Sequence, residues 1–137
     1  MQKDGQLSVQ DAAEIFYNDV PTGLRNAAVA ELLPQARRSA ETVCGAPAWA
    51  DAIFDGRRAY VLCALDRAIP MAGQNHMIQQ SGVQWDLKTL YTGHAPFLSR
   101  PEELSAWTIA EVLEFQGLQG PDILAQNRIV GGGSATS

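Results

Sequence analysis

The pattern of apolar and polar positions predicts a strand, a helix and a second strand between residues 59 and 91. Ala59 to Leu65 is a continuous apolar run, which is typical of a short strand buried on both faces. Met71 to Ser81 has helical spacing, and Gly82 is a natural residue for ending that helix. Trp85 to Tyr91 alternates enough to be the next strand. Because a helix joins them, the two strands should be parallel, with a right-handed crossover.

Further helices and a turn are predicted on both sides of this unit. Ser8 to Asp11 resembles a capping box that would open a short helix. Asn18 to Pro21 is a turn, and Thr22 can cap the helix that follows it. Ser99 to Glu102 forms a second capping box, from which a helix should run to about Gln116.

Composition narrows the classes of protein to consider. The chain has 137 residues, enough for one small domain, and its net charge is −5 without a Lys/Arg run, so nucleic acid is not an expected partner. We expect no membrane partner either, because no apolar stretch is long enough to span a bilayer. The N-terminus lacks an apolar signal region, which predicts a cytoplasmic location. Two cysteines and two histidines make neither a disulfide framework nor a metal site, so no metal is expected.

Candidate chemistry lies just beyond the two predicted strands. Asp66 follows the first strand and His94 follows the second. Functional groups collect at the carboxyl ends of parallel strands, and neighbouring strands lie roughly 5 Å apart. Asp66 would therefore accept a hydrogen bond from Nδ1–H of His94, as in a catalytic triad. The alternative is that Asp66 is a turn residue and His94 a loop histidine.

The nucleophile of such a triad is missing from the sequence. No Gly-x-Ser-x-Gly segment occurs, and Gly132-Gly133-Ser134-Ala135-Thr136 lacks the last glycine. Cys63 lies within a predicted strand, where it should pack as a small hydrophobe. Cys44 has no histidine near it in sequence. Neither cysteine is a good substitute for the serine.

Two motifs resemble the C-terminal part of α/β-hydrolases. They are Asp66-Arg-Ala-Ile-Pro70 and Gly93-His94-Ala95-Pro96-Phe97, and their acid and histidine are 28 positions apart. They look most like the methylesterase and hydroxynitrile lyase branch, where the acid follows the penultimate strand and the histidine the last one. The upstream Glu14-Ile-Phe-Tyr-Asn-Asp-Val-Pro21 is similar to the end of that family's cap.

The resemblance implies an α/β fold class. The chain would be a partial α/β-hydrolase fold: the last two parallel strands, flanking helices and the end of a helical cap. The implied divisions are a cap remnant at residues 1–45, a core segment at residues 46–116 and a flexible tail at residues 117–137. The rest of the core would be absent, which leaves an apolar strand edge open to self-association or to a complementing chain.

The resemblance also implies a function. The parent activity would be hydrolysis of a small-molecule ester-like substrate, with hydroxynitrile cleavage as a minor option and without a cofactor. Asp66 would orient His94, which would act as general base and then as general acid. Phe97, Phe16 and Tyr17 would line the substrate pocket. Two alternatives remain open: a non-catalytic remnant or binding module that lacks the nucleophile, and one half of a split hydrolase.

Overall fold

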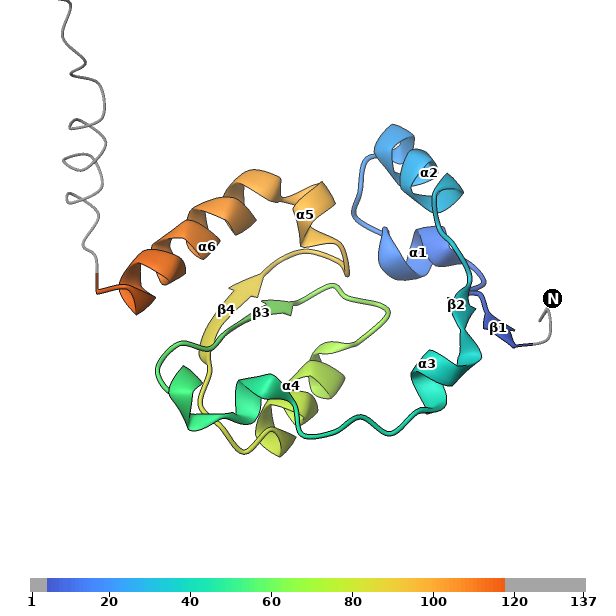
Figure 1. The fold of residues 1–137 in the computed structure, drawn as a ribbon. Coiled ribbons are helices and arrows are strands. Elements are labelled where there is room, and N and C mark those ends of the chain that lie inside the picture. The colour runs from blue at the N-terminus through green and yellow to red at the C-terminus, as the bar shows by residue number, and fades with distance from the viewer. Residues whose placement is uncertain (1–4, 118–137) are drawn as a thin grey trace, which may run out of the picture. The chain divides into compact units, whose positions relative to one another are not determined.

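The computed structural model describes residues 5–117 of the chain (Figure 1). The chain divides into two compact units, one ending at Pro101 and the other beginning at Glu102. The candidate catalytic residues both belong to the first unit. The boundary expected at residue 45 stays a prediction, and residues 118–137 of the expected tail lie outside the described residues.

The predicted β-α-β unit is present. It consists of β3 (Ala59–Cys63), α4 (Met71–Gln80) and β4 (Asp86–Leu90), and the two strands are parallel (Figure 1). Their register pairs Ala59 with Asp86 and Cys63 with Leu90. Both strands are shorter than predicted, but backbone hydrogen bonds continue past them, from Ala64 N to Leu90 O and from Leu65 N to Thr92 O, both at 2.9 Å. Gly82 has φ +67, which confirms it as the residue that ends α4.

The N-terminal segment contains the two predicted helices and, in addition, a small sheet that the sequence pattern did not predict. Strands β1 and β2 form an antiparallel pair of two residues each, too short to show any periodicity in the sequence. Two 3₁₀ turns, η1 and η2, precede β3. The elements are β1 (Gln6–Leu7), α1 (Ala12–Phe16), α2 (Thr22–Ala30), β2 (Gln35–Ala36), α3 (Arg37–Glu41), η1 (Ala48–Ala50) and η2 (Ala52–Phe54).

Two of the predicted helix caps are wrong. Helix α1 begins three residues later than the Ser8 capping box requires, after Asp11 in a left-handed conformation with φ 53. Helix α2 begins at Thr22 itself, with Pro21 as its N-cap residue and no side-chain cap. Pro21 restricts φ to −52, so the backbone turns into the helix before Thr22 can act as a cap.

The second predicted capping box, Ser99 to Glu102, is interrupted by an extra helical turn. Ser99 ends α5 (Pro96–Ser99), and its hydroxyl contacts Thr92 Oγ1 at 2.5 Å and the Ala95 carbonyl at 3.4 Å. The helix predicted after it, α6 (Pro101–Phe115), is present, and Gly117, two residues beyond its end, has φ +66. The long helix was therefore predicted correctly. The hydroxyl of Ser99 does not cap it but hydrogen-bonds to Thr92 in the loop after β4.

The buried apolar core of the described residues is small. It consists of Ala12, Val20, Leu62, Cys63, Leu90 and Ala95. The prediction that the first strand is buried on both faces holds only for its last two residues, because the beginning of β3 is half-buried. Among the described residues each strand of the β3–β4 sheet has one neighbour, and Leu87 of β4 is 52% exposed.

The described residues thus combine helices with two small sheets, of which one is parallel. This arrangement is compatible with the α/β class at a coarse level. None of the helices in residues 5–117 has both the length and the apolar character that crossing a bilayer requires.

Leu90 and Leu87 provide a matched test of this core. Leu90 is 0% exposed, so Leu90→Ala should lower the free energy of unfolding by about 2–5 kcal/mol. Leu87→Ala removes the same atoms from the same strand at an exposed position, and should cost less than about 1 kcal/mol. Urea unfolding measures both values, and equal losses would contradict the placement of the core.

Candidate active site

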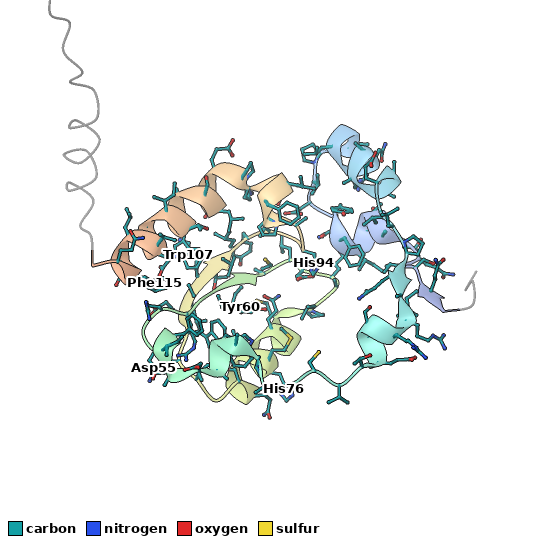
Figure 2. The ribbon with its side chains drawn as sticks, viewed as in Figure 1. Asp55, Tyr60, His76, His94, Trp107 and Phe115 are labelled. Carbon is teal, nitrogen blue, oxygen red and sulfur yellow. The ribbon has the colours of Figure 1, made fainter. Side chains whose placement is uncertain are left out.

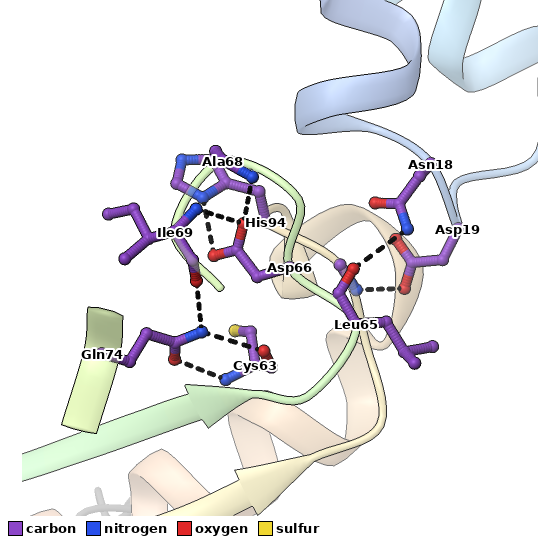
Figure 3. Close-up of polar contacts among 10 residues, drawn as sticks. Asn18, Asp19, Cys63, Leu65, Asp66, Ala68, Ile69, Gln74 and His94 are labelled. Carbon is purple, nitrogen blue, oxygen red and sulfur yellow. Dashed lines mark hydrogen bonds and ion pairs between the residues drawn. The ribbon is translucent and has the colours of Figure 1, made fainter. Parts of the chain in front are cut away.

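The loops that leave β3 and β4 bring Asp66 and His94 together. Nδ1 of His94 lies 2.9 Å from Oδ2 of Asp66, within hydrogen-bond distance (Figure 3). When Nδ1 carries the proton it donates to the carboxylate, and the other ring nitrogen, Nε2, is then the base. The pairing predicted from sequence is therefore present in the structure.

The carboxylate of Asp66 is fixed by its own loop. Its Oδ1 accepts hydrogen bonds from the backbone N–H of Ala68 at 2.8 Å and of Ile69 at 3.0 Å (Figure 3). The side chain is only 6% exposed. Asp66 therefore has both of the roles considered from the sequence. Its Oδ1 stabilises the turn, and its Oδ2 contacts His94.

Gln74 anchors the same loop to the sheet. This buried α4 side chain accepts a hydrogen bond from Cys63 N at 2.9 Å and donates to Cys63 O at 3.0 Å. It also donates to the carbonyl of Ile69 at 2.7 Å (Figure 3). Sequence reasoning missed this residue, although a glutamine on the helical face toward a sheet is a signal, since a buried amide needs partners.

His94 is partly open to solvent. Its side chain is 37% exposed, and no described residue hydrogen-bonds to its Nε2. The ring of Phe16 lies near the imidazole, with centroids 5.2 Å apart and planes tilted by 34°. The free nitrogen is therefore accessible beside an apolar wall, which suits a base that must meet an external hydroxyl.

The three aromatic residues expected at a substrate pocket differ in position. Phe16 contacts His94, and Tyr17 contacts Phe16 edge-on with ring centroids 6.2 Å apart. Phe97 lies in α5 and is 61% exposed, so it covers little of the described surface. Their part in substrate binding stays a prediction.

Phe16 also lines an apolar pocket. This open pocket has a volume of about 530 Å³ and is lined by residues of α1, α2 and the β1–β2 region, among them Val9, Ala12, Val29 and Leu32. A second pocket of about 150 Å³ lies between Trp49, Tyr60 and Trp85, where the Trp85 indole N–H donates to Ser81. Phe16 connects the larger pocket with the imidazole.

The turn between α1 and α2 contacts both loops that carry the Asp66–His94 pair. The amide of Asn18 donates to the carbonyl of Leu65 at 3.1 Å (Figure 3). Oδ2 of Asp19 accepts from Gly93 N at 2.8 Å and from Thr92 Oγ1 at 2.7 Å. Sequence reasoning recognised this turn but not its contacts, because no local pattern reports partners that lie 47 to 74 positions away.

The environment of Asp19 favours its ionised form. Burial raises the pKa of its carboxyl, but hydrogen bonds from Gly93, Thr92 and Ser99 outweigh burial and hold the pKa below its ordinary value of 3.8. The other oxygen, Oδ1, is buried and makes no hydrogen bond with the described residues. Asp19 is thus a carboxylate fastened through one oxygen.

No nucleophile contacts the pair within residues 5–117. Cys63 is buried, and burial together with the charges of Asp66 and Asp19 raises the pKa of its thiol to about 11. Ser134 lies outside the described residues. In the part of the chain that the structure describes, no group of three or more His, Cys, Asp or Glu side chains is placed to hold a metal ion.

Comparisons with known proteins leave the family open. No protein-family model and no curated protein matches the chain. The resemblance to α/β-hydrolases therefore stays a prediction from the two sequence motifs.

Gly93 allows a direct test of the packing around the pair. A Cβ at this position would lie 2.2 Å from Asn18 Oδ1 and 2.7 Å from Asp19 Oδ1, so Gly93→Ala must displace both side chains. We expect a loss of about 1–3 kcal/mol in the free energy of unfolding. Gly73→Ala is the control, because its Cβ meets Ile69 at an ordinary 3.4 Å within α4. It should stabilise by up to about 1 kcal/mol.

Thiol reactivity tests the exclusion of Cys63 as a nucleophile. With a pKa of about 11, roughly one Cys63 in a thousand is a thiolate at pH 8. Iodoacetamide should therefore modify the Cys44→Ser protein, which retains Cys63, at least about tenfold more slowly than the Cys63→Ala protein. The difference should disappear in urea, where both thiols are exposed. Fast modification of native Cys63 would refute its assignment as a packing residue.

Proposed function

We propose that Asp66 and His94 are the acid and the base of a serine-hydrolase-type site, in a chain that is the C-terminal part of an α/β-hydrolase. The single observation that carries the proposal is the 2.9 Å contact between Oδ2 of Asp66 and Nδ1 of His94. The contact joins the two residues that the family motifs select, at the carboxyl ends of two parallel strands.

In the proposed reaction, His94 is the proton carrier. Nε2 takes the proton of the attacking hydroxyl, and the imidazolium is stabilised by Asp66 through Nδ1–H. The same nitrogen then gives the proton to the leaving alcohol of the ester. General base catalysis of this kind contributes about 10²–10⁴-fold to a rate.

The nucleophile must come from outside the described residues. Removing a triad serine costs on the order of 10⁶ in turnover in a studied protease, so the pair alone would be a very weak catalyst. We propose that a Gly-x-Ser-x-Gly segment completes the site, supplied by another part of the same protein or by a complementing chain. The apolar pocket that shares Phe16 with His94 favours an ester with an apolar portion.

A binding module without catalysis is the second candidate. The observation that favours it is the pocket of about 530 Å³, which is formed by the described residues without any nucleophile. Such a module would hold an apolar small molecule beside Phe16 and would not need His94.

Fluorophosphonate labelling decides between the two. The tagged chain, expressed in the cells that make it, is treated with the probe and recovered with any bound protein. We expect a labelled serine within a Gly-x-Ser-x-Gly segment, and a fall in labelling of at least about 10³-fold with His94→Ala. His76→Ala is the matched control, because His76 is exposed on α4 and is the only other histidine (Figure 2).

The mass of the labelled protein identifies which chain carries the serine. Labelling that is unchanged by His94→Ala would contradict the proposed role of the histidine. Absence of any labelled serine, on the chain or on a bound protein, would contradict acyl hydrolysis and favour the binding module.

A further inference from the structure

We propose that the turn Asn18–Asp19 positions the His94–Asp66 pair by fastening the two catalytic loops to each other. Only the effect of this turn on catalysis rests on the proposed function. The turn lies between α1 and α2, in the segment that resembles the end of a cap, and its two side chains each bind a different loop.

The anchor points lie one residue before each member of the pair. Asn18 holds the carbonyl of Leu65, which precedes Asp66, and Asp19 holds the N–H of Gly93, which precedes His94. The pairing of β3 with β4 ends at this point, with the bond from Leu65 N to Thr92 O. The turn therefore holds the two loops together at the point where the hydrogen bonds between β3 and β4 end.

Charge makes Asp19 the stronger of the two anchors. Hydrogen bonds to an ionised carboxylate are about twice as strong as neutral ones. The network extends from Asp19 through Thr92 to Ser99 in α5, and so spans the loop that carries His94 on both sides. Asn18 Oδ1 and Asp19 Oδ1 both lie against Gly93, where a Cβ would displace them.

Phe16 adds a second contact from the same segment. It lies two residues before Asn18 and packs near the imidazole ring with centroids 5.2 Å apart. The cap-like segment thus restricts both the backbone before His94 and one side of its ring. Small displacements matter here, because a misplacement of about 1 Å can cost on the order of 10² in rate.

Nuclear magnetic resonance of the His94 ring tests the proposal without requiring activity. In the wild-type chain the Nδ1 proton should be protected from exchange with water by its bond to Asp66. Asp19→Asn keeps the size of the side chain but removes its charge, and should speed the exchange of that proton at least about tenfold. Glu31→Gln is the control, since it removes the same charge from an exposed residue just after α2.

A second variant separates positioning from general stability. Thr92→Val removes one donor to Asp19 and leaves the carboxylate in place, so its effect on Nδ1 exchange should be smaller than that of Asp19→Asn. Exchange that is unchanged in a folded Asp19→Asn protein would overturn the positioning role alone. A wild-type chain without a protected Nδ1 proton would refute the pair itself, and with it the proposed function.

Discussion

The parallel pairing of β3 with β4 is the interaction on which the rest of the site depends. Parallel strands end at the same edge of a sheet, about 5 Å apart, so residues far apart in the chain leave it side by side. The register pairs Cys63 with Leu90 at that edge, and Asp66 and His94 follow in the loops just beyond it. Their hydrogen bond depends on this register. If one strand slipped by one residue, each of its side chains would lie on the opposite face of the sheet.

Polar side chains also fix the loops. The apolar core is small, whereas Gln74, Asn18 and Asp19 each bind backbone groups at the ends of the two strands. Networks of this kind specify one geometry, because an unpaired buried group is costly. The side-chain oxygen Oδ1 of Asn18 and Oδ1 of Asp19 are buried and make no hydrogen bond with the described residues. Their desolvation therefore opposes part of the stabilisation that the network provides.

The proposed site has a histidine that is held on one side and open to solvent on the other. One nitrogen of His94 is held by Asp66, and the other is accessible beside Phe16 and an apolar pocket. A pair arranged in this way is useful only with a hydroxyl to activate. Under the proposed hydrolase function that hydroxyl would come from outside the described residues, whereas the pocket by itself would suffice for binding.

The sequence by itself determined the elements with local signals. Periodicity predicted the two strands and their helix, and the position of Asp66 and His94 after the strands predicted their contact. Tertiary structure decided the contacts that leave no local trace: Asn18 and Asp19 on loops 47 to 74 positions away, and Ser99 bound to Thr92 instead of capping a helix. Short-range rules describe how a backbone turns, but the partner of a buried polar group depends on which distant segment lies beside it.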